Sequence, residues 1–154
     1  MAHDLEGMVS HILEEMHALQ GAMLPILHAI QDSIGYVPEE AVPLVAKGLN
    51  VSRAEVHGVL TFYRHFRRTP PGKHVLQICC AESCQAMGAN RLAEHAKKAL
   101  GCDFHELSRD GLFSLEPVYC LGQCATSPAV MIDGEVHARM NPEKLDRLLE
   151  GTES

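Results

Sequence analysis

The most informative segment of the chain is HVLQICCAESCQAMG, residues 74–88. Its apolar and β-branched beginning predicts a strand that ends at Cys79, and Cys84 follows just after it. A second pair, Cys120 and Cys124, comes directly after another predicted strand. Loops that leave the ends of two strands can meet in space. We therefore expect these four thiols to converge.

Strands and helices alternate through the C-terminal half of the chain. The expected elements are the strand 74–79, a helix over 85–100 closed by Gly101, weaker strands over 104–108 and 112–119, a hairpin of 129–132 and 136–139, and a last helix from Asn141 to Gly151. The pair Asp133-Gly134 between the hairpin strands is typical of a type I′ turn. This order predicts a small sheet covered by helices.

The N-terminal half contains no Cys, and its apolar residues recur at helical spacing. Leu5, Met8, Val9, Ile12, Met16 and Leu19 form the first stripe, which we expect to end at Gly21, followed by helices that stop at Gly35 and span 41–49. Ser52 with Glu55 forms a capping box that starts a fourth helix, whose buried stripe is Val56, Val59, Leu60, Tyr63 and Phe66. The pattern is that of a helical bundle.

The run Thr69-Pro70-Pro71-Gly72 marks a linker between the halves, because proline removes backbone donors and disfavours helix before it. We place the domain boundary here, with a helical region over 1–69 and a second region over 70–154. The predicted fold class is α+β.

Charge and composition exclude some functions. The 154 residues include 13 Lys and Arg against 20 Asp and Glu, a net charge of −7, which disfavours nucleic acid and anionic lipid as partners. No apolar run is long enough to span a bilayer, and the acidic beginning of the chain is unlike a signal peptide. We therefore expect a cytoplasmic protein whose six Cys serve as ligands rather than disulfides.

Three chemistries compete for the two Cys pairs. A Rieske centre needs two His ligands, which do not follow either pair closely, and the chain has no C-x-x-C for a thioredoxin-type dithiol. Zinc stays possible, although its usual knuckles are tighter than the C-x4-C and C-x3-C found here. A [2Fe-2S] cluster held by Cys79, Cys84, Cys120 and Cys124 fits best.

Two cysteines remain. Cys80 could in principle replace Cys79, but we assign it to packing beside the ligand loop, and Cys102 to a small apolar role. Gly122 and Gly88 permit close approach of backbone N–H groups to sulfur. A helix beginning near Cys84 would also favour the negative charge that reduction adds.

Longer motifs resemble a known family. Gly88-Ala89 follows the first pair, Ser127-Pro128 and Asn141-Pro142-Glu143-Lys144 follow the second, and the helical half contains Leu24-Pro25-Ile26-Leu27-His28, Gly35-Tyr36-Val37-Pro38, Glu55-Val56-His57-Gly58-Val59 and Thr61-Phe62-Tyr63. Over residues 20–150 the chain resembles the thioredoxin-like [2Fe-2S] ferredoxin subunits of NADH-linked flavoprotein complexes. The resemblance implies a helical bundle followed by a thioredoxin-like [2Fe-2S] domain.

The resemblance also implies a role and partners. Members serve as the 24 kDa subunit of complex I, in the diaphorase part of NAD-reducing hydrogenases, and as the gamma subunit of NAD-dependent formate dehydrogenases. The stretches Leu115–Tyr119 and Gln123–Pro128 look most like the last of these. The chain would then be an electron-transfer subunit without a catalytic site of its own. FMN and NAD would lie on a partner flavoprotein, and a molybdenum cofactor on a formate dehydrogenase subunit.

A function of another class is also open. Residues 45–56 resemble a helix-turn-helix, in which Ser52 would open the recognition helix of a cluster-bearing transcription regulator. The charge of this half weighs against that alternative, because nucleic-acid modules carry a basic footprint and residues 1–70 are net acidic. Its one basic cluster, Arg64, Arg67 and Arg68, lies at the wrong end of the helix for base contacts.

Overall fold

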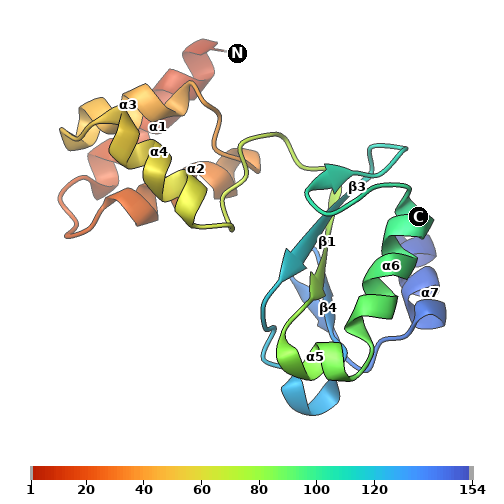
Figure 1. Ribbon diagram of the computed structural model, residues 1–154. Helices are drawn as coiled ribbons and strands as arrows, with labels where there is room; N and C mark the ends of the chain where they lie inside the picture. The colour runs from red at the N-terminus through yellow and green to blue at the C-terminus, as the bar shows by residue number, and fades with distance from the viewer. Residues whose placement is uncertain (1, 153–154) are drawn as a thin grey trace. The chain divides into compact units, whose positions relative to one another are not determined.

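The computed structural model describes residues 2–152, and the chain forms two compact units, Met1–Pro70 and Pro71–Ser154. The first unit is helical and the second contains a five-stranded mixed sheet with helices against it (Figure 1). The predicted α+β class is confirmed. No helix in the described range is long and apolar enough to cross a bilayer.

Four helices make the first unit: α1 (Ala2–Met16), α2 (Met23–Ile34), α3 (Ala41–Leu49) and α4 (Arg53–Phe62). Their apolar faces enclose one core, because residues spaced three and four apart lie on the same side of each helix. Its buried members include Val9, Ile12, Ile26, Leu27, Ile30, Val45, Val56 and Leu60. The predicted helix 41–49 and the stop at Gly35, which is left-handed and donates its N–H to Gln31 O, are confirmed.

Two predicted helix ends are wrong. Helix α1 ends at Met16 rather than near Gly21, because Leu19 is not part of the core of the bundle and is 53% exposed. Helix α4 ends at Phe62, so Tyr63 and Phe66 lie beyond it. Phe66 is nevertheless buried in the core, while Tyr63 is 42% exposed.

Buried Gln31 holds the segment that follows α4. Its Nε2 donates to the backbone oxygen of His65 at 2.9 Å, and its Oε1 accepts from the N–H of Arg67 at 2.7 Å. The oxygen of Arg67 in turn accepts from the N–H of Val37 at 2.7 Å. A buried amide with both ends paired costs little and fixes the backbone that it bonds. One side chain of α2 therefore determines where the chain leaves the bundle.

The capping box of α4 is confirmed. Ser52 Oγ accepts from the N–H of Glu55 at 3.2 Å, and a Glu55 carboxylate oxygen accepts from the N–H of Ser52 at 2.8 Å. These bonds from Ser52 lower the pKa of the exposed Glu55 carboxyl.

We expect Ser52→Ala to reduce the free energy of unfolding by about 1 kcal/mol, because an N-terminal N–H of α4 loses its acceptor. The pKa of Glu55 is lower in the folded state than in the unfolded state. The contribution of the Glu55 carboxylate to the free energy of unfolding is therefore present above its unfolded-state pKa, and it is lost as the pH falls through its folded-state pKa. Urea unfolding at pH 7 and at pH 3 checks both points. The Ser52→Ala deficit should shrink at pH 3, and an equal deficit at both values would contradict the coupling of Ser52 to the Glu55 carboxylate.

The second unit contains β1 (His74–Cys79), α5 (Glu82–Ala86), α6 (Ala89–Leu100), β2 (Glu106–Leu107), β3 (Phe113–Val118), η1 (Cys124–Thr126), β4 (Val130–Ile132), β5 (Glu135–His137) and α7 (Pro142–Thr152). The sheet order is β2-β3-β1-β4-β5. Strands β1 and β3 are parallel, with Cys79 opposite Val118, and the other pairs are antiparallel. A strand occurs at each predicted place, and β1 has the predicted bounds, but β2, β3, β4 and β5 are shorter than expected, and β2 contains only Glu106 and Leu107.

Helices α6 and α7 lie against one face of the sheet (Figure 1). Alternate residues of the strands point to that face, and the buried core contains Leu76, Ile78, Phe113, Leu115, Val130 and Ile132 from the sheet with Leu92, Ala96, Leu145 and Leu149 from the helices. His95 Nε2 of α6 lies 2.6 Å from Asp146 Oδ1 of α7, which joins the two helices. The unit is thus packed on one side around β1.

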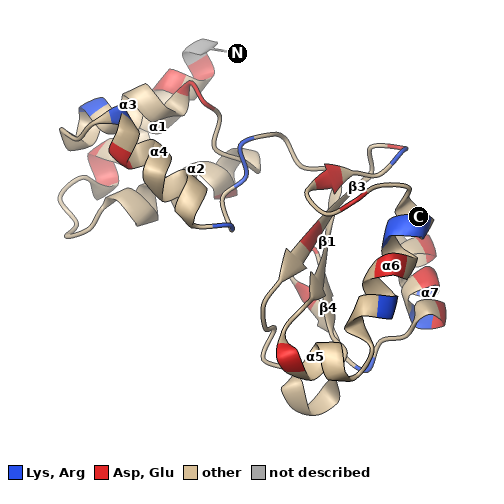
Figure 2. Ribbon diagram, in the orientation of Figure 1, with Lys and Arg blue, Asp and Glu red and all other residues tan. Residues whose placement is uncertain are grey.

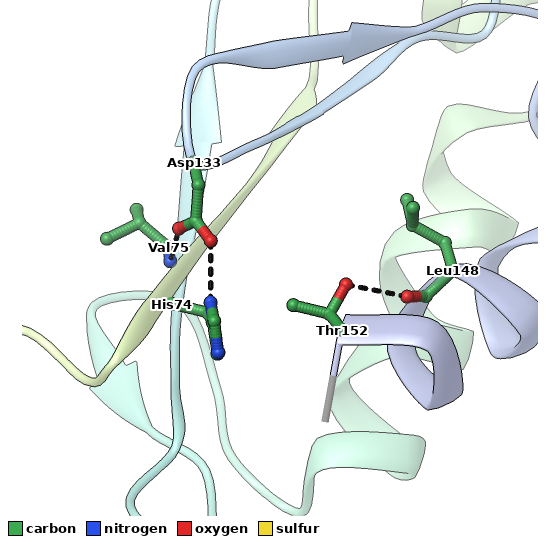
Figure 3. Close-up of polar contacts among 5 residues, drawn as sticks. All are labelled: His74, Val75, Asp133, Leu148 and Thr152. Atoms are coloured by element: carbon green, nitrogen blue, oxygen red, sulfur yellow. Dashed lines mark hydrogen bonds and ion pairs between the residues drawn. The ribbon is translucent and has the colours of Figure 1, made fainter. Parts of the chain in front are cut away.

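The β4–β5 hairpin is tied to the start of β1 (Figure 3). Asp133 Oδ1 accepts from the N–H of Val75 at 2.8 Å, and its Oδ2 lies 2.6 Å from His74 Nδ1. Asp133 and Gly134 both have positive φ, as the predicted type I′ turn requires.

Helix α7 ends at Thr152, just past the predicted stop at Gly151. The Thr152 hydroxyl donates to Leu148 O at 2.7 Å within its last turn (Figure 3).

The predicted helix 85–100 is wrong at its beginning. The chain forms the short α5, interrupts at Gly88 and starts again as α6. Gly88 has φ +96°, a left-handed conformation that a helix cannot continue through and that glycine adopts without strain. Cys84 consequently lies inside the single turn of α5 rather than at the start of a long helix.

Candidate metal centre

One end of the sheet gathers the ligand loops. Parallel strands β1 and β3 end at the same edge, so the residues after Cys79 and after Val118 leave from neighbouring positions. Helix α5 follows β1 and η1 follows the turn after β3, and the two short helices lie at the same end of the unit in Figure 1. All six cysteines are free thiols.

The first pair, Cys79 and Cys84, is buried, and each residue is 2% exposed. Each affects the ionisation of the other: Cys84 lowers the pKa of Cys79, and Cys79 raises the pKa of Cys84. They pack with Ala89 and Ala129, and partly buried Ala81, Val118 and Leu121 surround them. The inner pair therefore has an apolar shell drawn from both ligand loops.

The second pair, Cys120 and Cys124, is exposed, and its Sγ atoms lie 3.7 Å apart. The N–H of Gly122 approaches Cys120 Sγ at 3.4 Å. This is the contact expected from the sequence, where a glycine between two ligands lets the backbone turn its N–H toward sulfur.

Cys120 has φ +98°, which is uncommon for a residue with a side chain. The backbone N–H groups of Cys120 and Leu121 both lower the pKa of the Cys79 thiol. Successive N–H groups turned toward one point form an anion-binding nest. The strained turn thus brings donors from the second ligand loop onto a ligand of the first.

The pKa of Cys79 reflects this nest. Burial raises the pKa of the thiol, but hydrogen bonds from the N–H of Ala81, from Cys84, and from the N–H groups of Cys120 and Leu121 outweigh burial and lower it overall. Cys79 is therefore a site prepared for a thiolate, the form in which cysteine binds metal.

The other ligands carry further donors. Burial raises the pKa of Cys84, while bonds from the N–H of Ala129 and the hydroxyl of Ser127 oppose that rise. The side-chain hydrogen bond with Cys120 raises the pKa of Cys124. Neighbouring thiols that oppose each other's ionisation, as these do, are compensated when cations bind between them.

Cys80 and Cys102 have other surroundings. The thiol of Cys80 lies 3.5 Å from Ile78 O, and the backbone N–H of Cys80 donates to Val118 O at 2.7 Å. Burial raises the pKa of both Cys80 and Cys102. Cys102 packs against the core between sheet and helices. Only Cys79 of the adjacent pair receives N–H donors from the second ligand loop.

The donor set fits a [2Fe-2S] cluster. Within residues 2–152, no three His, Cys, Asp or Glu side chains form a group around one metal ion. A two-iron cluster does not require such a group, because its four thiolates are divided between two irons. Cys79 with Cys84, and Cys120 with Cys124, provide two such pairs.

Several of these donors were not expected from the sequence. The hydroxyl of Ser127, and the N–H groups of Ala81, Leu121 and Ala129, have no distinctive sequence signal. The expected helix start near Cys84 is that of α5, which begins at Glu82 and is a single turn. The N–H of its N-cap residue Ala81 is one of the groups that lower the pKa of Cys79, and loop N–H groups add to it.

Comparison with known proteins identifies the family. The family described as thioredoxin-like [2Fe-2S] ferredoxin matches residues 9–153, which includes both units. A subunit of the NADH-quinone oxidoreductase of Pseudomonas aeruginosa is 35% identical over 144 residues, which cover 92% of this chain and 87% of that protein. The HndA subunit of the NADP-reducing hydrogenase of Solidesulfovibrio fructosivorans is 31% identical over 141 residues, covering 92% of this chain and 82% of that protein.

A solved structure has the same fold. The NAD+-reducing [NiFe]-hydrogenase in its H2-reduced state superposes on 80% of this chain with a TM-score of 0.68 and 20% sequence identity. The present chain spans 21% of the hydrogenase chain that it matches.

Proposed function

Because the chain belongs to the thioredoxin-like [2Fe-2S] ferredoxin family, we propose that it is the electron-transfer subunit of an NAD-linked oxidoreductase complex. In this role its [2Fe-2S] cluster exchanges electrons with FMN on a partner subunit. The observation that carries the proposal is the convergence of two Cys pairs, with loop N–H groups directed at their sulfurs.

We assign the ligands as Cys79, Cys84, Cys120 and Cys124. When bound, the cluster supplies storage of one electron at a time. The chain's own part is to hold the four thiolates and to lower the cost of the charge that reduction adds. The N–H groups on Cys79 and Cys120 and the donors on Cys84 serve that purpose.

The outer pair marks the side that a redox partner approaches. Cys120 and Cys124 are exposed, as are Tyr119 and Met87 nearby in the ligand loops. No charged residue occurs in residues 117–132, and in Figure 2 the ribbon at the end of the unit that bears α5 is mostly tan, with a red segment on α5. Removing water from an uncharged surface around a cluster costs little free energy when a partner binds.

FMN and NAD belong on a partner, since the chain has no Gly-rich phosphate loop between a strand and a helix. Hydride transfer moves two electrons, so a flavin that divides the pair needs a one-electron site beside it. The names of the two relatives, one from an NADH-quinone oxidoreductase and one from a hydrogenase, support a place in such a complex.

Our finer proposal is the gamma subunit of an NAD-dependent formate dehydrogenase in the cytoplasm, with a molybdenum-containing subunit as a further partner. It rests on the stretches Leu115–Tyr119 and Gln123–Pro128, which resemble that branch of the family. The equivalent position in complex I or in an NAD-reducing hydrogenase is the alternative.

We propose that the helical unit is the docking element of the complex. It has a complete core of its own and no candidate ligand. At the end of α4 it exposes two aromatic side chains, Phe62 at 77% and Tyr63 at 42%, with ring centroids 4.9 Å apart. Exposed aromatic residues are frequent anchors of protein interfaces.

Purification of the native complex tests the assignment. We expect a flavoprotein and a molybdenum protein to co-purify with this chain, and the complex to reduce NAD with formate. Metal analysis and mass spectrometry of the partners provide the measurement. Finding nickel would assign the chain to a hydrogenase, and finding membrane subunits of a quinone reductase would assign it to complex I. A complex without flavin would contradict the general proposal.

The isolated chain should oxidise neither formate nor NADH with artificial acceptors. Mixed with its flavoprotein partner, it should show the spectrum of a reduced [2Fe-2S] cluster when NADH is added, to the extent its potential allows. NADH oxidation by the chain alone would contradict the assignment of FMN and NAD to another subunit.

A further inference from the structure

Two serine hydroxyls lie between the two ligand loops. Half-buried Ser83 is in α5 and directly precedes Cys84, and buried Ser127 follows η1. The Ser83 hydroxyl donates to Cys124 O at 2.8 Å, and the Ser127 hydroxyl donates to the same oxygen at 2.7 Å. The two Oγ atoms are 2.8 Å apart. The Cys124 carbonyl and the two hydroxyls therefore form a triangle of hydrogen-bonding oxygens.

The two bonds to the Cys124 carbonyl differ in what they connect. Ser127 is three residues from Cys124, so its bond stays within the second ligand loop. Ser83 is 41 residues from Cys124 and lies in the turn that bears Cys84, so its bond joins the two loops. Each hydroxyl has one hydrogen, and when both hydrogens are used within the triangle the carbonyl receives at least one of them. Loss of Ser127 would leave the connection between the loops, and loss of Ser83 would remove it.

The loop that Ser83 holds is the less enclosed of the two. The first Cys pair is buried and packs with apolar side chains, whereas both residues of the second pair are exposed. Segments with few buried contacts open locally at low cost in free energy. A side-chain hydrogen bond from α5 is therefore a substantial part of what keeps the second loop closed.

We propose that Ser83 is a positioning residue, which ties the loop bearing Cys124 to the α5 turn bearing Cys84 and so slows opening of the second loop and release of the cluster. The inference rests on the proposed ligand set. The described bonds of the Ser83 hydroxyl go to Cys124 O and to Ser127 Oγ, so Ser83 acts through the backbone of a ligand residue.

The test is the rate at which the full-length, cluster-loaded protein loses its visible absorption in excess EDTA. Ser83→Ala should release the cluster about fivefold faster, the factor that corresponds to one lost hydrogen bond. Ser127→Ala should accelerate release by less than about twofold, because the bond from Ser83 remains. Thr126→Val is the matched control and should release at the wild-type rate, since the Thr126 hydroxyl bonds Gln123 within the second loop. Equal acceleration by Ser83→Ala and Ser127→Ala would overturn the proposal.

A pair of variants with the same shape separates the hydroxyl from the volume of the side chain. Ser83→Thr keeps the hydroxyl and should retain the wild-type rate of release, whereas Ser83→Val lacks it and should behave like Ser83→Ala. The pair also decides the matter if Ser83→Ala loads no cluster, because only Ser83→Thr should then load iron and sulfide normally. Equal behaviour of Ser83→Thr and Ser83→Val would be contrary to a role for the hydroxyl.

EPR of the dithionite-reduced protein provides a second readout. Ser83→Ala should give broader lines than the wild type, because a less firmly held ligand loop gives the cluster a wider range of geometries, and Ser83→Thr should restore the line width. A loaded Ser83→Ala protein with unchanged line width and unchanged release would overturn this inference. Failure of the wild type to load iron and sulfide would instead overturn the ligand set.

Discussion

Serine in place of Cys79, Cys84, Cys120 or Cys124 is expected to abolish or distort the [2Fe-2S] cluster, and this is the largest effect of any single substitution that we predict. Each variant removes one of the four thiolates, and a serine oxygen is a harder and less polarisable ligand. Iron and acid-labile sulfide analysis should fall from two of each per chain in the wild type. EPR of the reduced protein should lose or change its signal.

Cys80→Ser and Cys102→Ser are the matched controls. Cys80 follows Cys79 directly in the chain but directs its thiol to Ile78 O, and Cys102 is partly buried against the core between the sheet and the helices. Both variants should keep the cluster. A normal signal in Cys79→Ser together with loss in Cys80→Ser would overturn the ligand assignment, and tightly bound zinc without iron in anaerobically prepared protein would refute the cluster itself.

Removal of the helical unit should leave the cluster intact and abolish assembly with the flavoprotein. The fragment Pro71–Ser154 contains every proposed ligand, every described donor to their sulfurs and a core separate from that of the helices. Absorption and EPR test the cluster, and pull-down with the partner subunit tests assembly. Unchanged assembly would place docking in the second unit, and a salt-sensitive, sequence-specific DNA complex of residues 1–70 would favour the regulator alternative.

A full-length variant tests the same idea without a truncation. We expect Phe62→Ser combined with Tyr63→Ser to weaken binding to the flavoprotein, because both rings are exposed and the fold loses little when they are removed. Leu19→Ser, which changes an exposed apolar residue in the loop between α1 and α2, is the control for general loss of apolar surface. Equal weakening by both variants would contradict a specific role for the end of α4.

Some of the fold could be predicted because its determinants are local. The capping box joins Ser52 and Glu55, three residues apart, and the hairpin turn depends on the adjacent pair Asp133-Gly134. The α+β class follows from apolar periods that change from helical to strand-like along the chain. The two Cys pairs and their order are likewise present in the sequence, as is the resemblance to the [2Fe-2S] ferredoxin family.

Helix ends were predicted less well where packing decides them. Leu19 continues the α1 stripe in the sequence, but no core lies beneath it, so the helix has already ended. Phe66 has helical spacing too, yet it reaches the core from an irregular segment that Gln31 holds. The spacing of apolar residues in the sequence shows which of them could lie on one helix face. Whether they are buried there depends on residues from other parts of the chain, so the spacing alone does not predict where a helix ends.

The class of fold, the candidate cluster and the four proposed ligands follow from the order and types of the residues alone. Tertiary structure alone decided how each sulfur is surrounded: that Cys79 rather than Cys80 receives the N–H groups of the second ligand loop, and that Ser83 and Ser127 meet over the Cys124 carbonyl. Ser83 and Ser127 are 44 residues apart in the chain. Such contacts depend on the parallel pairing of β1 with β3 and on the break at Gly88, which bring α5 beside η1. A hydrogen bond to sulfur needs alignment within a few tenths of an ångström, and only the packed structure sets the positions of distant loops that closely.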